Sequence, residues 1–235
     1  YQVQEIQTQL AHEVLGDVSV VTRFADYKLF NGVPFPGRIQ QYWGGTQTLD
    51  IQVSQVQVNP SFVISIPGLV LGGEPRVLSE QLADGVWLLS GGPHSSVAIE
   101  MQDQVLLVDC PLSRARAQAL FDAVQRLAPG KDIASVMVTH HHFDTVGGVR
   151  GAMDLGASVV VSQISRSVVE RWVTAKRKDP SKPGGRKGSP PPFTSVAGKA
   201  TFNDGKRAVE MHVLDGNVHA QGMLVAYLPK EKLLI

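Results

Sequence analysis

The sequence lacks the residues and runs that would point to several common classes of protein. Cys110 is the one cysteine, so no disulfide can form within the chain. Lys and Arg number 22 against 21 Asp and Glu, and a net charge of +1 gives no electrostatic reason to expect nucleic acid as a partner. No apolar run reaches the ~18 residues of a transmembrane helix, so no membrane partner is expected.

No signal peptide is recognisable either, and the chain begins with Tyr1 rather than Met, which predicts a processed product. The lack of disulfides does not exclude export, because many exported proteins have none. What is present is a length of 235 residues, enough for one large domain or two small ones, and 43% hydrophobic residues, enough for a proper core.

The chain changes character near residues 70–76, where we place a domain boundary. Residues 1–75 are rich in glutamine and contain no catalytic constellation. The spacing of Ile6, Leu10 and Val14 predicts a short helix over 4–15. Antiparallel strands with a Gly44-Gly45 hairpin turn are expected after it. We therefore expect a small N-terminal α+β module with a packing or substrate-rim role.

Residues 76–235 show the strand–helix–strand pattern of an α/β domain. Ser113 is expected to cap a helix that carries Leu120 and Val124 on its apolar face and stops at Pro129-Gly130. A buried strand is predicted over 133–138.

A later stretch, residues 176–192, holds six Lys and Arg and is expected to be a loop. A solvated surface is preferred there over a nucleic-acid contact, because no aromatic side chains alternate with the charges.

Metal-ligating side chains gather directly after the buried strand, in Thr139-His140-His141-His142-Phe143-Asp144-Thr145-Val146-Gly147-Gly148. Imidazole and carboxylate are ligands that zinc and similar ions favour. If the extended geometry of the strand continues, alternate side chains share one side. His140, His142 and Asp144 would then face one way and His141 the other.

A tetrahedral catalytic zinc typically has three protein ligands and one water. His219 is the best candidate for the third ligand, because it lies in a glycine-flanked turn just after a strand. His212 alternates with core residues on a strand, which favours a polar-face position. For His94, in a turn after Gly91-Gly92, a hydrogen-bonding structural role is favoured over ligation. A structural role for all seven histidines would need the spacing, the strand context and the third histidine to coincide by chance.

The pattern T-H-x-H-x-D-x-x-G-G after a strand, with a later glycine-flanked histidine before Y-L-P-K-x-K-L-L, resembles the metallo-β-lactamase superfamily over residues 77–235. The resemblance implies an αβ/βα sandwich with metals at the ends of two sheets. It implies that His140, His142 and His219 hold a first zinc and that Asp144 is a ligand of a second.

The same resemblance gives supporting roles to residues that do not bind the first metal. Asp109 matches an acidic residue that braces the ligand loops, although a plain strand-end cap explains it equally well from the sequence. Thr145 is expected to support the ligands, and His141, which would face away from its neighbours in an extended chain, is expected to support them or to have a structural role. The N-terminal segment resembles a module of some exported members, which implies a periplasmic or secreted protein.

Two departures from the family pattern affect the expected site. Thr145 stands where the family usually has histidine, so a second metal site should be weaker or differently built. The chain also stops at Ile235, before a strand that carries a bridging aspartate in the family. We therefore expect a sandwich that is incomplete at the C-terminus, with a homo-oligomer or a missing segment covering its apolar surface.

The resemblance predicts a zinc-dependent hydrolase in which metal-bound hydroxide attacks a small carbonyl-type substrate, a β-lactam, ester or thioester. Asp144 would orient the nucleophile and shuttle its proton. One zinc is expected, and a second is left open. The alternative is a zinc-binding protein of the same fold with weak or no activity. A nuclease of the superfamily rests only on the basic residues 176–187.

Overall fold

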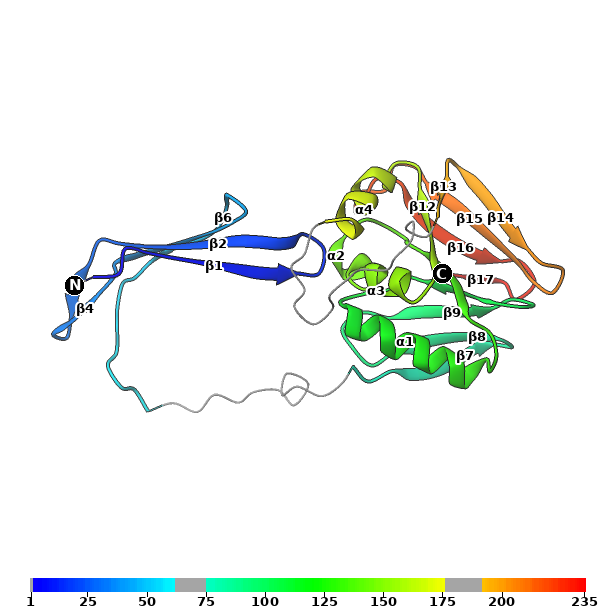
Figure 1. Cartoon of the computed structure of the whole chain (residues 1–235), viewed down its shortest axis with the longest axis horizontal. Coiled ribbons are helices and arrows are strands. Elements are labelled where there is room, and N and C mark those ends of the chain that lie inside the picture. Colours follow the sequence, from blue (N-terminus) through cyan, green and yellow to red (C-terminus); the bar gives the residue numbers. More distant parts are fainter. Residues whose placement is uncertain (1, 62–74, 176–191) are drawn as a thin grey trace. The chain divides into compact units, whose positions relative to one another are not determined.

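The computed structural model describes residues 2–61, 75–175 and 192–235. They form two compact units, the first within 2–61 and the second from the other two ranges (Figure 1). The boundary predicted near 70–76 falls mostly outside the described residues, as does the basic segment 176–187. Both stay predictions.

The first unit is a four-stranded antiparallel sheet in the order β1-β2-β5-β6, with a separate hairpin of β3 and β4. The strands are β1 (Glu5–His12), β2 (Gly16–Ala25), β3 (Lys28–Phe30), β4 (Val33–Phe35), β5 (Arg38–Trp43) and β6 (Thr46–Gln52). The predicted turn at Gly44-Gly45 is confirmed, because both glycines adopt positive φ between β5 and β6.

The helix predicted over residues 4–15 is wrong, because most of this segment is strand β1. Every residue of β1 pairs with β2, from Glu5 opposite Arg23 to His12 opposite Gly16. The spacing of four residues between Ile6 and Leu10 fits both structures, since such residues share a face in a helix and in a strand. Pairing with β2 decides between them, and the described part of this unit is all-β.

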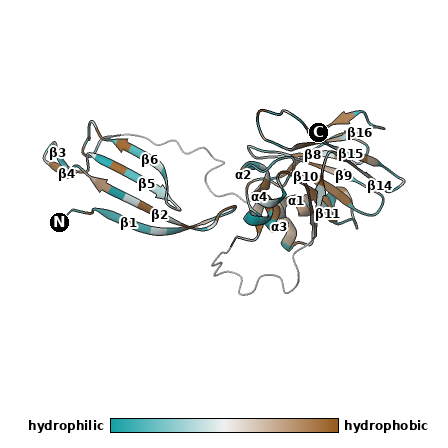
Figure 2. Ribbon diagram, turned by 90° about the horizontal axis from the view of Figure 1, so that it is seen from above, coloured by the Kyte–Doolittle hydropathy of each residue, from teal (hydrophilic) through white to brown (hydrophobic). Residues whose placement is uncertain are grey.

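The sheet of the first unit has an apolar face and a polar face, and its strands alternate between the two kinds of residue (Figure 2). On the apolar face, Ile51 lies opposite Ile39, which lies opposite Phe24. Ile51 remains 41% exposed. A single sheet of this kind needs a second layer to bury its apolar face. The homo-oligomer expected from the sequence stays a prediction.

The second unit contains two sheets that pack face to face. The larger has the order β13-β12-β11-β10-β9-β8-β7, and the smaller has the order β14-β15-β16-β17. The larger sheet consists of β7 (Leu78–Ala83), β8 (Val86–Ser90), β9 (Ser96–Glu100), β10 (Val105–Val108), β11 (Ile133–Met137), β12 (Ser158–Ser162) and β13 (Phe193–Val196). The smaller consists of β14 (Lys199–Asn203), β15 (Ala208–Leu214), β16 (Met223–Leu228) and β17 (Leu233–Leu234). Strands β10 to β13 run parallel, and the other neighbours pair antiparallel.

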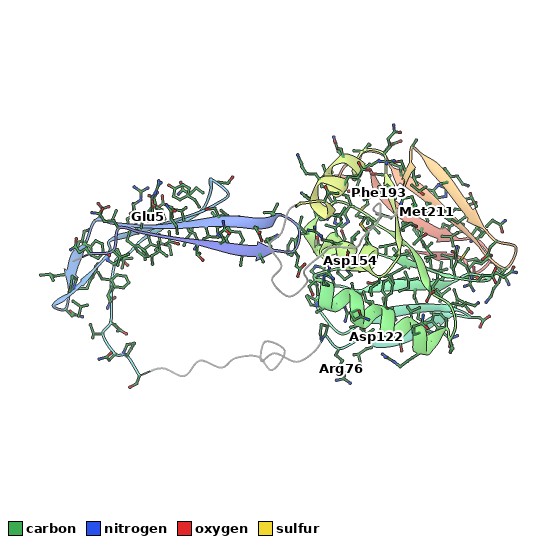
Figure 3. All side chains as sticks on the ribbon, in the orientation of Figure 1. Glu5, Arg76, Asp122, Asp154, Phe193 and Met211 are labelled. Carbon is green, nitrogen blue, oxygen red and sulfur yellow. The ribbon has the colours of Figure 1, made fainter. Side chains whose placement is uncertain are left out.

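The main hydrophobic core lies between these two sheets. Leu106 and Val108 of β10 pack in the same buried cluster as Met211 of β15, which is fully buried. Figure 3 labels Met211 among the side chains of the second unit. Side chains alternate along a strand, so Val105 and Leu107 face the opposite side of the larger sheet. The layered α/β architecture confirms the predicted fold class.

Helix α1 (Arg114–Leu127) follows its sequence signals closely. Ser113 is the N-cap, and its Oγ accepts a hydrogen bond from the backbone N–H of Arg116 at 3.2 Å. Leu120 and Val124 are buried, as predicted. The remaining described helices are α2 (Phe143–Val146), α3 (Val149–Asp154) and α4 (Arg166–Val173). None of the helices in the described ranges combines the length and apolarity needed to cross a membrane.

Arg207, just before β15, joins the two sheets of the second unit. Its guanidinium pairs with Glu231 at 2.9 Å, and the two side chains are only 4% and 9% exposed. It also donates to the carbonyl oxygens of Gly85 at 3.0 Å and Glu100 at 2.5 Å, both on the larger sheet's side, and to that of Asp84. A buried charge held in this way is costly to expose or to leave unpaired.

Arg207→Met should therefore lower the free energy of unfolding by about 3–5 kcal/mol, because it leaves Glu231 buried without its partner. Lys206→Met is the matched control. Lys206 forms a surface ion pair with Glu100 at 3.1 Å, and its side chain is 38% exposed. That change should cost less than about 1 kcal/mol. Chemical denaturation measures both, and equal losses would contradict the role given to Arg207.

Candidate metal centre

Three imidazoles converge where the two sheets of the second unit meet. His140 and His142 follow β11, and His219 lies in the turn between β15 and β16. The ring centroids are 4.8 Å apart for His140 and His142, 4.7 Å for His140 and His219, and 4.6 Å for His142 and His219. One nitrogen of each ring lies within 4.8 Å of the other two. The structure thus brings together the three histidines that the sequence singled out.

The spacing of these nitrogens suits a single tetrahedral ion. Two ligand nitrogens ~2.1 Å from one zinc lie about 3.4 Å apart at the tetrahedral angle. The Nε2 atoms of His140 and His219 are 3.1 Å apart. Without a metal, two such nitrogens face each other and must share a proton. The three nitrogens therefore fit a zinc ion, although the identity of the metal stays a proposal.

His140 is held in the form that binds metal. Burial, together with the neighbouring His142 and His219, lowers its pKa to about 4, and Asp144 opposes the shift. The imidazole is therefore neutral at pH 7. A neutral imidazole is the protonation state that a metal ion needs.

The expectation that strand geometry continues through Asp144 is wrong. β11 ends at Met137, and Asp144 lies in the first turn of the short helix α2. The chain turns there because the backbone N–H groups of Thr145 and Val146 both donate to the carbonyl oxygen of His142. The positions of His140 and His142 are thus set by a bent loop rather than by strand alternation.

Thr145 closes this loop from inside. Its Oγ1 donates to the carbonyl oxygens of His140 at 2.8 Å and His142 at 3.0 Å. The residue is only 8% exposed. Its hydroxyl is therefore directed at the backbone of the ligand loop rather than at a metal.

The two glycines of the motif are required by close packing. A Cβ on Gly147 would lie 2.2 Å from the carbonyl oxygen of Leu112, and one on Gly148 would lie 2.9 Å from Cys110 Sγ. The chain between α2 and α3 thus packs directly on the loop that follows β10. Larger residues there would push the ligand loop outward.

Asp109 supports the ligand loop through Thr139, a residue that the sequence did not single out. Its carboxylate accepts from the backbone N–H and from Oγ1 of Thr139, both at 2.7 Å. Thr139 Oγ1 also lies 3.0 Å from His140 Nδ1. Since the hydroxyl gives its proton to Asp109, it accepts from Nδ1–H, which leaves Nε2 of His140 free of a proton. The place of Thr139 directly before His140 was the sequence signal that could have identified its role.

Desolvation raises the pKa of Asp109 to about 7, although the bonds from Thr139 lower it. Asp109 also adopts a φ of +57° at the end of β10. Aspartate tolerates this left-handed conformation better than most residues. Both features indicate a site where the surrounding fold imposes an unfavourable arrangement to place one carboxylate.

Asn217 positions the third histidine. Its Oδ1 accepts from the backbone N–H groups of His219 at 2.8 Å and Ala220 at 3.2 Å, which forms an Asx turn. The sequence Asn-Val-His in a turn-rich stretch was the signal that would have identified it.

The other predicted histidines lie outside the cluster. His141 Nδ1 is 3.3 Å from Ser165 Oγ, and its ring lies 6.3 Å from that of Trp172. His212 lies on β15 and contacts Glu210 at 3.0 Å, as expected for a polar-face residue. His94 is different, because its Nε2 lies 3.3 Å from Asp144 Oδ2, beside the ligand loop.

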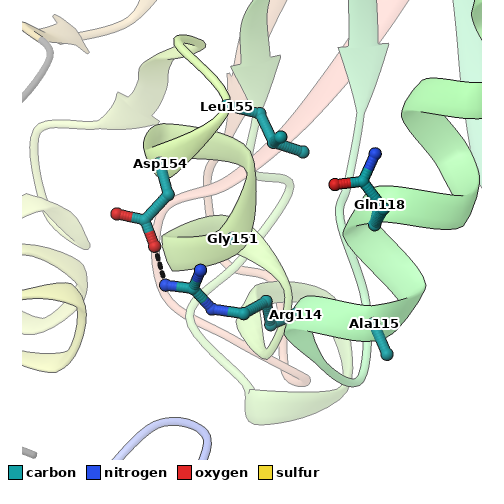
Figure 4. Close-up of a pocket in the computed structure, with 6 residues that line it drawn as sticks. All are labelled: Arg114, Ala115, Gln118, Gly151, Asp154 and Leu155. Carbon is teal, nitrogen blue, oxygen red and sulfur yellow. Dashed lines mark hydrogen bonds and ion pairs between the residues drawn. The ribbon is translucent and has the colours of Figure 1, made fainter. Parts of the chain in front are cut away.

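A separate cavity of about 300 Å³ lies between α1 and α3 (Figure 4). Its lining residues are Arg114, Ala115, Gln118, Gly151, Asp154 and Leu155. Arg114 and Asp154 form an ion pair within it. None of the three clustered histidines lines this cavity, so it is not part of the candidate metal centre.

Comparison with known proteins places the domain in a family. The family model for the metallo-beta-lactamase superfamily matches residues 89–235. The 2,4-dinitroanisole O-demethylase subunit alpha of Nocardioides sp. (strain JS1661) is 26% identical over 175 residues, which cover 73% of this chain and 49% of that protein. A linear primary-alkylsulfatase of Pseudomonas sp. is 32% identical over 75 residues, 32% of this chain and 11% of that protein. The chain thus spans half or less of these relatives.

Solved structures share the fold. A metallo-beta-lactamase from Pontibacter korlensis superposes with a TM-score of 0.54 at 19% identity, covering 68% of this chain and 70% of the other. The DIM-1 metallo-beta-lactamase superposes with a TM-score of 0.52 at 19% identity, covering 68% of each chain. At this level of identity the likeness concerns the fold alone.

Thr145→Val should lower the free energy of unfolding by about 1–2 kcal/mol, because it removes the one hydroxyl proton that the carbonyl oxygens of His140 and His142 share, without changing the side-chain volume much. Thr201→Val, at an exposed position of β14, is the matched control and should change stability by no more than about 0.5 kcal/mol. Chemical denaturation followed by circular dichroism measures both. A Thr145 variant as stable as the control would show that the loop does not depend on this hydroxyl.

Proposed function

The chain belongs to the metallo-beta-lactamase superfamily, and on this premise we propose that it is a zinc-dependent hydrolase of small carbonyl-type substrates, a β-lactam, ester or thioester. The observation that carries the proposal is the convergence of His140, His142 and His219. Within the described residues, these are the only three metal-ligating side chains whose ligand atoms lie so close together.

Zinc held by these histidines would lower the pKa of its water from ~15.7 toward ~7 and polarise the substrate's oxygen. The chain's own residues prepare that site. Thr139 and Asp109 orient the ring of His140, whose neutral form is ready to bind. Asp144 is close enough to oppose the lowered pKa of His140. In this proposal it orients the nucleophile and carries its proton to the leaving group.

The substrates to be assayed for hydrolysis come from two sources. β-Lactam, ester and thioester substrates follow from the proposed acyl chemistry. The curated relatives are named for an alkyl sulfate and for 2,4-dinitroanisole, so an alkyl sulfate and an aryl methyl ether belong on the panel. The resemblance of the N-terminal segment to exported members supports a periplasmic or secreted location, which is part of the same proposal.

A second candidate function is zinc binding with weak or no turnover. It is favoured by Thr145, whose hydroxyl is used by the backbone of the ligand loop and is not a metal ligand. Stoichiometric zinc with no turnover on the whole panel would favour this function. Turnover that is lost on chelation and restored by zinc would favour the hydrolase.

His142→Ala should abolish tight zinc binding, because it removes one of three ligands and leaves the fold intact. His212→Ala is the matched control, since His212 lies on β15 away from the cluster. Zinc content after dialysis, measured by atomic emission, should fall from about one equivalent to near zero only in the His142 variant. Stoichiometric zinc in His142→Ala would show that the ligand assignment is wrong.

Thr139→Val should weaken zinc binding by about 10–100-fold while one zinc still binds at saturation, because the ring of His140 loses the hydroxyl that fixes its tautomer. Thr201→Val serves as the control and should bind zinc as the unmodified protein does. Competition with a chromogenic chelator gives the affinities. If Thr139→Val retains full affinity, Thr139 does not orient the ligand.

A further inference from the structure

Three large apolar side chains stand exposed on the loops around the clustered histidines. They are Phe143 at 56%, Ile164 at 57% and Val218 at 104% exposed. Among the described residues of the second unit, the one other large apolar side chain that is more than half exposed is Leu234. Isolated apolar side chains on a surface need no explanation. Three of them on separate loops around one centre do.

The three side chains belong to the same part of the fold. Phe143 and Val218 are direct sequence neighbours of two clustered histidines. Ile164 comes from the turn between β12 and α4, and a Cβ on Gly222 would lie 2.8 Å from Ile164 Cβ. Ile164 therefore lies against the turn between β15 and β16, which carries His219.

Hydrogen bonds hold the turns that present Val218 and Ile164, so neither side chain is exposed because its chain is frayed. The turn with Val218 is closed by the side chain of Asn217. In the other turn, the N–H groups on either side of Ile164 donate to the carbonyl oxygens of Val196 at 2.9 Å and Ser162 at 3.1 Å. The fold thus fixes both apolar groups at the surface.

The segments around the histidines contain no lysine or arginine. These segments are residues 91–95, 139–148, 163–165 and 215–222. Asp144 and Asp215 are the acidic residues in them. Arg166 follows the third segment, but its guanidinium binds Glu170 at 2.8 Å. A carboxylate on the substrate would find no cationic side chain in these segments, and an unpaired charge is costly to remove from water.

We propose that Phe143, Ile164 and Val218 form an apolar subsite, and that the substrate is an ester or thioester with an uncharged, hydrophobic acyl group. The inference rests on the proposed function, because it names the substrate class of the same centre. An acyl chain that covers these side chains removes apolar surface of both molecules from water. Each methylene that is fully buried in this way strengthens binding by about 4-fold.

The first test compares two esters with the zinc-loaded full chain. p-Nitrophenyl hexanoate ends in a methyl group, and the p-nitrophenyl monoester of adipic acid has a carboxylate in the same place. After division by each ester's rate with hydroxide alone, kcat/KM should be about 10-fold or more higher for the hexanoate. From the acetate to the hexanoate it should rise by about 2–4-fold per methylene.

Val218→Lys is the main variant, because it places an ammonium group in the subsite at a fully exposed position. It should lower the preference for the hexanoate over the adipate monoester by about 3–10-fold. Leu234→Lys is the matched control. Leu234 is 70% exposed and pairs with Tyr227, towards the end of β16 that is remote from His219, so the preference should not change.

A second measurement does not depend on turnover. The methyl NMR signals of Val218 and Ile164 should shift when hexanophenone is added, since this ketone resembles the ester but cannot be hydrolysed. They should shift less with 5-benzoylpentanoate, which has a carboxylate at the end of the same chain. The methyl signals of Leu234 should stay in place with both compounds.

Two outcomes overturn the subsite and leave the hydrolase intact: equal or better turnover of the adipate monoester by the unmodified chain, or an unchanged preference in Val218→Lys. Shifted methyl signals without turnover of any ester would refute the hydrolase and retain the apolar site. The absence of both turnover and shifts would remove both proposals.

Discussion

Thr139 is the point at which the two sheets of the second unit are held together at the metal centre. Its backbone N–H and its hydroxyl donate to Asp109, at the end of β10 in the larger sheet. Its carbonyl oxygen accepts from the backbone N–H of Leu224 in the smaller sheet at 2.7 Å. The chain passes from this residue directly to His140. The position of His140 thus depends on three hydrogen bonds that require both sheets to be in place.

Contacts before β15 and within it hold the scaffold around this junction in place. Arg207 precedes the strand and binds carbonyl groups of the larger sheet, while His219 lies in the turn after the strand. Met211, between them, is fully buried in the core that the sheets share. A ligand on a loop is placed accurately only when the elements that carry the loop are fixed. The contacts of Arg207 and the shared core therefore support the loops that carry the three histidines.

The chemistry of the centre depends on how a few side chains divide their roles. The hydroxyl of Thr145 bonds to the backbone of the loop that carries His140 and His142. The hydroxyl of Thr139 bonds to Asp109 and to His140. Hydroxyl groups rather than imidazoles thus hold the conformation of the loop that carries His140 and His142. Asp144 is left to meet His94 from another turn. Thr145 stands where the family usually has histidine, and in the folded chain the neighbouring Asp144 contacts His94 instead.

The sequence by itself determined the features that depend on residues close together in the chain. The Ser113 cap, the buried face of α1, the Gly44-Gly45 turn and the His140, His142 pair after a strand are all of this kind. Tertiary structure decided the rest. It made residues 5–12 a strand, because pairing with β2 satisfied their backbone where spacing fitted either structure. It also brought His94 to Asp144 and Asp109 to Thr139, because contacts between segments distant in the chain arise from sheet packing, which no local pattern encodes.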